Sequence, residues 1–426
     1  MQIKGNAFSE IIALPHLDST LTATLLRLKN IDFTGQIEKT KENVNLKGYI
    51  DTECGGIDIN IESDKNTIIS GDIKTNNFNI GQLTDNEKFG HASFSLQGTD
   101  IKEVSTKDKE SITGNIAGVI NEIEYYGYKY TGIDISAFSN IDVVGGEVNV
   151  NDENLRLSFS GSIETKTNMK KCHLSLIVNK FRPYTLNITS NYKGDNFSLN
   201  ATANVSGNNI NNIVGELSLD SMIVSGSNGA SSPEHLQIQL ESDRLKSKKI
   251  HIDGNIIYAN IKGDIDYRTL GASIVSKFKT HLPTIFNKKV RTNNAYDFNI
   301  EIKDSKFIRH LLKKDYYIDS PILIKGNAND EENRIEINID NDKMTYEGIK
   351  YENINIACTN TNEICEASAD ITRIDNEGKT NFTLYADAQE DTLSTKTSWR
   401  TEGKFDKKGI PNNSNGTINA QILFSD

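Results

Sequence analysis

The sequence has few of the residues, and none of the short motifs, that mark common enzymes and metal proteins. Proline occurs 6 times, cysteine 4 times and tryptophan once in 426 residues. The cysteines form no C-x-x-C pair, which argues against a zinc site or a thioredoxin-type site. The chain also lacks G-x-S-x-G, a P-loop and a G-x-G-x-x-G followed by a helical pattern. We therefore predict that the protein is not an enzyme, has no catalytic residues and takes neither a cofactor nor a metal.

The histidines and acidic stretches do not change this prediction. The 7 histidines are scattered, and none has a partner at the helical or hairpin spacing of a metal site. The acidic stretches NANDEEN (327–333) and NIDNDK (338–343) lack the spacing and the glycine of an EF-hand loop, so we interpret them as solvated turns. Cys358 and Cys365 flank TNTNEI and could face each other across a hairpin. A disulfide and two free core thiols both remain open for this pair.

The charge balance and the missing targeting signals restrict the partners and the location. The formal net charge is −11, and Lys and Arg are mixed with Asp and Glu, so nucleic acid is not an expected partner. No stretch approaches the roughly 18 apolar residues of a membrane helix. No signal peptide is visible at the start. We expect a cytosolic chain or a segment of a longer protein whose targeting segment lies elsewhere.

The dominant pattern is an alternation of apolar and polar residues. In GGIDINIES (55–63), for example, every second residue from Ile57 to Ile61 is apolar. This period places successive side chains on opposite faces of a strand, and it predicts antiparallel sheets with one apolar and one solvated face. The apolar positions that we select on such strands are Ile57, Ile59, Ile61, Leu155, Leu157, Phe159, Leu174, Leu176, Phe197, Leu199, Ala201, Val205, Ile257, Ile261, Ile265, Ile335, Ile337 and Ile339.

Repeats indicate how the strands are joined. YYGYKYTGIDI (125–135) and YEGIKYENINI (346–356) share Tyr, Gly, Lys and Ile positions, and each predicts a strand, a tight turn and a strand. Strands that end in x-G-x-[I/F] recur, and glycine inside a strand marks a bend that would curl a sheet. The glycines of this pattern are Gly48, Gly71, Gly161, Gly254, Gly263 and Gly326.

Few segments have helical spacing. We expect helical insertions near 266–286 and 305–314, and an irregular start over 1–40. We see no clear domain boundary, so residues 1–426 are expected to form one continuous segment. The predicted fold class is mainly β: an extended, repetitive antiparallel array, curled into a groove-like sheet, with a few short helices. An apolar face of this length must be covered by another sheet, close into a tube or hold something apolar.

Several stretches resemble the TamB family, the AsmA-like translocation and assembly module proteins of Gram-negative envelopes. They are FSLNATANVSGNNINNIVGELSLDSMIVSG (197–226) with the LQIQLESD stretch that follows, LSFSGSIETK, and the two related strings quoted above. The resemblance covers most of the chain from about residue 40. It implies a taco-like β array in the periplasm, anchored in the inner membrane by an N-terminal helix, with an apolar interior. This sequence shows neither that anchor nor a convincing C-terminal domain, so we expect an internal segment or a truncated product.

The resemblance also implies a function. The family is proposed to transport phospholipid between the membranes and to assist outer-membrane protein assembly, and its C-terminal domain meets an Omp85-type barrel. We therefore expect a groove that holds or conducts phospholipid along the apolar positions selected above. One alternative is a chaperone-like factor that pairs with nascent outer-membrane β-strands. Another is a secreted β-solenoid or adhesin scaffold with a sealed core.

Overall fold

The computed structural model shows a chain built mainly of antiparallel β-strands, with about 69% strand and 7% helix. It describes residues 2–4, 26–64, 67–105, 110–226, 229–232, 235–243, 247–286, 291–304, 306–376, 378–403 and 413–425. Within each of the two units described below, the strands form a curled antiparallel sheet. The predicted fold class is therefore confirmed.

The chain divides into two compact units. Unit 1 comprises Met1–Asn204 and Ser225–Ala230, and unit 2 comprises Val205–Val224 and Ser231–Asp426. Each unit is described by itself. That residues 1–426 form one continuous segment stays a prediction.

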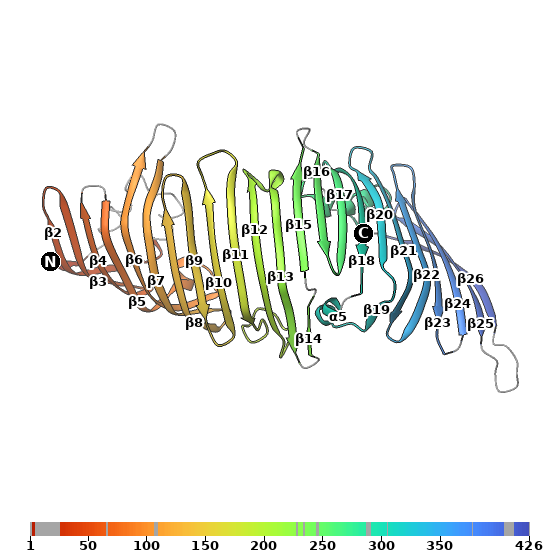
Figure 1. Ribbon diagram of the computed structural model, residues 1–426, viewed down its shortest axis with the longest axis horizontal. Coiled ribbons are helices and arrows are strands. Elements are labelled where there is room, and N and C mark those ends of the chain that lie inside the picture. Colours follow the sequence, from red (N-terminus) through yellow and green to blue (C-terminus); the bar gives the residue numbers. More distant parts are fainter. Residues whose placement is uncertain are drawn as a thin grey trace. The chain divides into compact units, whose positions relative to one another are not determined.

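Unit 1 is a run of hairpins in which each strand pairs with the next strand in sequence, as the ribbon in Figure 1 shows. Its strands are β1 (Gln2–Lys4), β2 (Ile31–Lys39), β3 (Asn43–Thr52), β4 (Gly55–Asp64), β5 (Thr67–Asn79), β6 (Phe89–Ser105), β7 (Glu110–Tyr125), β8 (Tyr128–Ser139), β9 (Val143–Asn151), β10 (Leu155–Glu164), β11 (Lys170–Phe181) and most of β12 (Asn196–Gly207). Both β1 and β2 lie inside the stretch 1–40 that we predicted to be irregular, and residues 5–25 lie outside the described residues. The short helix α3 (Ile80–Thr84) links β5 to β6.

Unit 2 continues the same antiparallel pattern. Its strands are most of β13 (Val214–Gly226), β15 (His235–Ser242), β16 (Lys248–Gly254), β17 (Ile257–Asp264), β18 (Ala295–Ile302), β19 (Tyr316–Ile318), β20 (Ile322–Asn329), β21 (Arg334–Tyr346), β22 (Ile349–Asn360), β23 (Cys365–Ile374), β24 (Gly378–Gln389), β25 (Thr392–Gly403) and β26 (Ser414–Leu423). The short β14 (Gly229–Ser231) lies in the connection between β13 and β15. The long strand β21 pairs with β20 along one part and with β19 along another.

The repeated string is a hairpin in both places. Tyr126 and Gly127 join β7 to β8 with φ values of 50° and 70°, and Glu347 and Gly348 join β21 to β22 with 49° and 78°. Positive φ at both central residues is the type I′ turn, whose twist matches that of the flanking strands. The glycine in each copy supplies the second positive φ without a steric cost.

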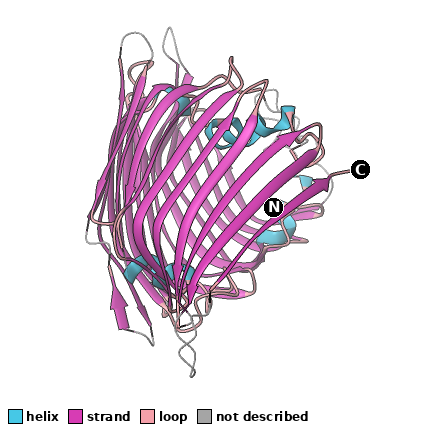
Figure 2. Ribbon diagram, turned by 90° about the vertical axis from the view of Figure 1, so that its right-hand side faces the viewer, coloured by secondary structure: helices cyan, strands magenta, loops and turns pink. Residues whose placement is uncertain are grey.

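The helices of unit 2 are insertions between strands. The helix α4 (Leu270–Ser276) and the 3₁₀ helix η2 (Lys277–Thr280) follow β17, inside the 266–286 stretch that has helical spacing. The helix α5 (Lys306–Leu312) follows β18, inside the 305–314 stretch. A 3₁₀ turn, η1 (Ile210–Asn212), precedes β13. In Figure 2 the helices lie near the ends of long, curved strands.

Candidate functional site

The candidate site in unit 1 is one continuous apolar face of the sheet. Residues that face each other on paired antiparallel strands project to the same side. The pairing registers connect such residues into rows that cross the sheet from β2 to β11. The register shifts of four of these ladders lie outside the rows, so within the rows the apolar positions of one strand meet those of the next.

Three rows make up this face. The first is Gly35, Gly48, Ile59, Ile73, Leu96, Gly118, Ile135, Val148, Phe159 and Leu176. The second is Ile37, Leu46, Ile61, Gly71, Gly98, Ile116, Ala137, Gly146, Gly161 and Leu174. The third is Phe33, Ile50, Ile57, Thr75, Phe94, Ile120, Ile133, Val150, Leu157 and Val178. None of these residues is charged, and Thr75 is the one hydroxyl.

Part of this face is open to solvent, at positions of the first and second rows, while most of the third row is half-buried. Ile116 is 45% exposed, Ile73 is 39% exposed and Phe159 is 36% exposed. A side chain that packs under a second layer would be nearly inaccessible, so no second layer built from the described residues covers these three positions. A closed cluster forms where Leu28, Cys54 and Phe78 pack with partly buried neighbours on and next to α3.

An apolar cleft of about 430 Å³ lies on this face, over β7 to β11. Its apolar lining is Ile116, Ile135, Ala137, Val144, Gly146, Val148, Phe159, Gly161, Ile163 and Leu174. The small residues of the second row form the hollow between larger side chains on either side. A Cβ added at Gly146 would lie 2.5 Å from the Ser136 carbonyl oxygen, so the close approach of these strands depends on glycine there.

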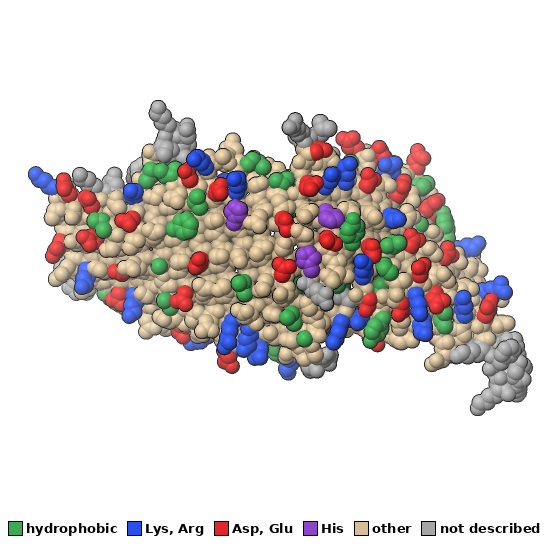
Figure 3. Space-filling view, in the orientation of Figure 1, with side chains coloured by type: hydrophobic (Ala, Val, Ile, Leu, Met, Phe, Trp, Pro, Cys, Tyr) green, Lys and Arg blue, Asp and Glu red, His purple; other side chains and the backbone are tan. Residues whose placement is uncertain are grey.

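The other face of the same strands is polar. Gln97, Ala117, Ser136, Glu147, Ser160 and Ser175 form the corresponding row on that side. In the view of Figure 3, Lys and Arg are interspersed with Asp and Glu, and apolar side chains occur in small groups. Among the described residues seen in this view, charges of both signs are mixed and no extended cationic patch forms.

Unit 2 also has apolar rows. One is Leu217, Ile238, Ile252, Ala259, Ile300, Ile324, Ile339, Ile356, Ala369, Leu384, Thr397 and Ile418. Near the helical insertion, however, the face is covered. Tyr296 is 6% exposed and Ala328 is 2% exposed, and both pack in one cluster with partly buried Leu270 and Phe278 from the insertion.

The residues selected from sequence fall into three groups by their exposure to solvent. Fourteen of them are half-buried, and they are Ile57, Ile61, Leu155, Leu157, Leu174, Leu176, Phe197, Leu199, Ala201, Val205, Ile257, Ile261, Ile337 and Ile339. Phe159 is exposed and lines the cleft. Ile59 is 8% exposed on the first row, while Ile265 and Ile335 are 1% and 0% exposed in the closed cluster. Ile265 and Ile335 are therefore buried beside the helical insertion and line no open surface in this structure, and the assignment of the selected residues to a lipid groove stays a prediction.

Sequence reasoning missed most of the cleft. Ile116, Ile135, Val144, Val148 and Ile163 line it but were not selected. The signal was present, because DVVGGEVNV (142–150) alternates in the same way as the strands that were chosen. What alternation alone does not show is that these strands are neighbours in register.

Other chemistry is sparse in the described part of the chain. No group of three or more His, Cys, Asp or Glu residues there is arranged to hold a metal. All four cysteines are free thiols, including Cys358 and Cys365, and burial is the main cause that raises the pKa of Cys365 to about 11. None of the described helices combines the length and the apolar character needed to cross a bilayer.

One polar cluster in unit 1 supports a turn. Asp152 accepts hydrogen bonds from Tyr128 Oη at 2.7 Å and from the Thr131 amide at 3.1 Å. Burial opposes ionisation of Asp152, but these hydrogen bonds outweigh it and hold the pKa of the carboxyl below its usual range. A carboxylate satisfied by its own turn fixes the chain between β9 and β10, and we assign it no further role.

Comparison with known proteins gives no relative. No family model matches the chain, and neither a curated protein nor a solved structure matches it.

Proposed function

We propose that this chain is the apolar groove of a TamB-like or AsmA-like protein, which holds or conducts phospholipid between the inner and the outer membrane. The observation that carries the proposal is the set of three uncharged rows across β2 to β11, with exposed apolar side chains along them. Soluble proteins rarely leave such a contiguous surface open unless it contacts something apolar.

An acyl chain suits the geometry of these rows. The rows cross the strands, so a hydrocarbon chain lying along the second row would contact successive strands about 4.8 Å apart. Each CH₂ group that leaves water on this face contributes about 0.8 kcal/mol. The small residues Ala137, Gly146 and Gly161 leave room for the acyl chain, and the larger Val148 and Phe159 flank it.

The polar part of the lipid would stay outside the rows. An ionised phosphate on an apolar face would lose its hydration and find no counter-charge there, which is unfavourable. Passage along the groove therefore needs no catalysis and no cofactor. Periplasmic location and a contact with an Omp85-type barrel through another region stay predictions.

The exposure of the rows favours this proposal over a sealed scaffold. A β-solenoid or adhesin core would bury Ile116 and Val144, which are both 45% exposed. The chaperone alternative also needs an open surface, so it is separated from lipid transport by the ligand that binds rather than by exposure.

The test is native mass spectrometry of the purified chain, followed by lipid extraction. We expect bound phospholipid in the wild type and its loss in Ile116→Asp, because a carboxylate would enter the apolar cleft. Ala117→Asp is the matched control, since Ala117 is the next residue on β7 and belongs to the polar row. Folded protein that carries no phospholipid, or equal lipid loss in both variants, would overturn the proposal. Selective binding of unfolded outer-membrane protein in place of lipid would support the chaperone alternative.

A further inference from the structure

Residues 266–286, here called the strap, run along one end of unit 2 and contact the turns there in succession. Thr280 Oγ1 accepts a hydrogen bond from Asn333 Nδ2 at 2.9 Å, in the β20–β21 turn. His281 Nε2 donates to the Thr361 carbonyl oxygen at 2.8 Å, in the β22–β23 turn. The Thr284 amide donates to Asp391 Oδ1 at 2.9 Å, in the β24–β25 turn. The strap thus bridges hairpins that are distant from it in sequence.

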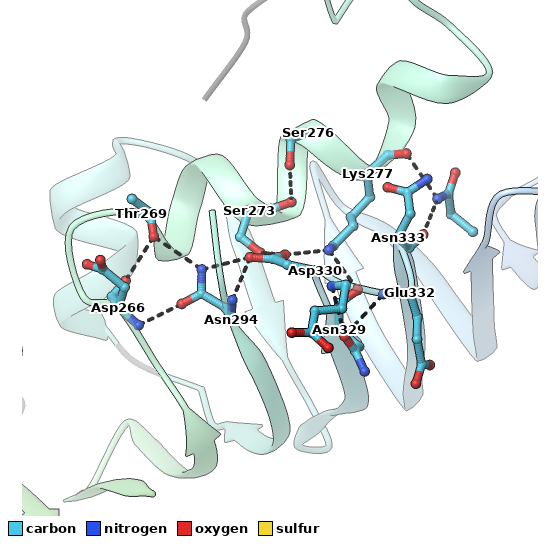
Figure 4. A network of polar contacts seen from close by, with 12 residues as sticks. Asp266, Thr269, Ser273, Ser276, Lys277, Asn294, Asn329, Asp330, Glu332 and Asn333 are labelled. Carbon is cyan, nitrogen blue, oxygen red and sulfur yellow. Dashed lines mark hydrogen bonds and ion pairs between the residues drawn. The ribbon is translucent and has the colours of Figure 1, made fainter. Parts of the chain in front are cut away.

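One buried ion pair anchors the strap, as Figure 4 shows. Lys277 Nζ contacts Asp330 Oδ1, and the two side chains are 2% and 4% exposed. Asp330 also accepts hydrogen bonds from Ser273 Oγ at 2.6 Å and from the Asn294 amide at 2.6 Å. Burial opposes ionisation of Asp330, but its hydrogen bonds, from Lys277 above all, hold the pKa of the carboxyl below its usual range. Asn360 Nδ2 also donates a hydrogen bond to the backbone carbonyl oxygen of Lys277 at 3.0 Å.

The strap is an excursion from a complete hairpin. Its flanking strands, β17 and β18, pair directly from Ile257 with Ile302 to Asp264 with Ala295. Displacing the strap would therefore break no ladder hydrogen bond of the sheet. The helix α4 spans 7 residues, which is too short to be stable without tertiary contacts. The strap consequently depends on its anchors, and its position can change while the sheet stays folded.

The closed position leaves polar groups unsatisfied. The hydroxyls of Tyr267 and Tyr296 are buried and have no hydrogen-bond partner. A buried hydroxyl without a partner costs free energy relative to one in water, so these two groups favour opening. The strap also carries apolar side chains that remain exposed when it is closed, since Val275 is 51% exposed and Ile285 is 45% exposed. These side chains would suit contact with hydrocarbon.

We propose that the strap is a displaceable cover that regulates access of an acyl chain to the apolar face of unit 2. This inference rests on the proposed function, because it assigns a gate to the same kind of groove. Opening would uncover Ile265 and Ile335. Ile335 pairs with Ala328 on β20, and both isoleucines belong to a cluster against which Ile261 and Ile337 pack. An acyl chain would then reach this part of the apolar face of unit 2 only when the strap is displaced.

Hydrogen–deuterium exchange of the full chain, read by mass spectrometry, tests the cover. Asp391→Gly removes the acceptor for Thr284, and glycine tolerates the φ of 58° at this position. Glu390→Gly is the matched control, because Glu390 is the other residue of the turn, has a φ of 48° and makes no hydrogen bond from its side chain to the strap. In lipid-free protein we expect strap amides to exchange about tenfold faster in Asp391→Gly, with β20 to β22 unchanged in both variants.

The second arm adds vesicles of palmitoyl-oleoyl phosphatidylglycerol and phosphatidylethanolamine. We expect strap amides of the wild type to exchange faster with vesicles, and unit 2 of Asp391→Gly to protect its apolar strands at a lower lipid concentration. The proposal is overturned if the strap amides exchange as slowly as those of β20 to β22 in every variant. It is also overturned if the strap amides exchange faster but lipid does not change the exchange of the apolar strands of unit 2. Failure of the proposed function is recognised separately, because lipid would then also leave β7 to β11 of unit 1 unprotected.

Discussion

The apolar face of unit 1 and the strap-covered end of unit 2 come from the same strand pattern but differ in access. Ile116 in unit 1 is 45% exposed, whereas Ile335 in unit 2 is 0% exposed. Both residues lie on apolar positions of alternating strands. The difference comes from residues 266–286, which pack over Ile335 and its neighbours. Alternation therefore builds an apolar face, and a separate segment decides whether that face is open.

The largest effect is expected from breaking the anchor of the covered end. Asp330→Ala would leave Lys277 buried without its counter-charge, and the loss of one partner of such a pair costs about 3–5 kcal/mol. Unit 2 should lose that much free energy of unfolding, measured by urea denaturation with exchange mass spectrometry as the local probe. The strands β7 to β11 of unit 1 should keep their protection.

The double variant Lys277→Met with Asp330→Leu is the control for this experiment. It removes both charges, and replacing a buried pair by apolar residues is often neutral or stabilising. We expect it to recover the part of the loss that comes from the unpaired Lys277 charge. Recovery should be partial, because Ser273 Oγ and the Asn294 backbone N–H lose their acceptor in both variants. If Asp330→Ala costs less than about 1 kcal/mol, the pair behaves as a surface ion pair and does not anchor the strap.

A smaller effect is expected from closing the open face of unit 1. Ala137→Phe places a ring in the apolar cleft, so it should lower phospholipid retention about tenfold, measured by lipid extraction. Ala117→Phe adds the same ring on the polar face of the neighbouring strand and should leave retention unchanged. Both alanines are exposed, and stability should change by no more than about 0.5 kcal/mol. Equal retention in the two variants would show that the cleft is not where the lipid lies.

The smallest effect is expected from substitutions in the turns of the two copies of the repeated hairpin. Gly127→Ala and Gly348→Ala each place a Cβ at φ values of 70° and 78°, with nothing nearer than 4.0 Å. The cost is backbone strain alone, about 1–2 kcal/mol for each turn. Thermal unfolding should show the same loss in both variants, because the strain is local to the turn. A loss confined to one copy would mean that the surroundings of that hairpin, and not its turn, determine the effect.

Much of the fold follows from short-range features of the sequence. Alternation at Ile57, Ile59 and Ile61 predicts strand β4, and the glycine after Tyr126 predicts the turn between β7 and β8. Gly71 and Gly161, selected as bends, both lie on the second apolar row. These features depend on residues that are close together in the chain, so pattern reasoning can find them.

The rest depends on distant residues. Ile335 belongs to a closed cluster against which Leu270 and Phe278 of the insertion pack, and the Lys277–Asp330 pair joins residues 53 positions apart. Neither relation has a local signature, because a buried lysine and a surface lysine look alike in sequence. The cleft was also hidden, since it requires that Ala137, Gly146 and Gly161 fall in register on three different strands.

The pairing of each strand with its sequence neighbour has a consequence for how this molecule can grow. In unit 1 every ladder from β2 to β11 joins consecutive strands, so contacts are short in sequence and each hairpin can form as soon as it leaves the ribosome. Duplicating or deleting one whole hairpin would preserve the direction of every remaining strand and the face on which its apolar side chains lie. Evolution could therefore change the length of the array in steps of two strands while the apolar residues stay on the same face.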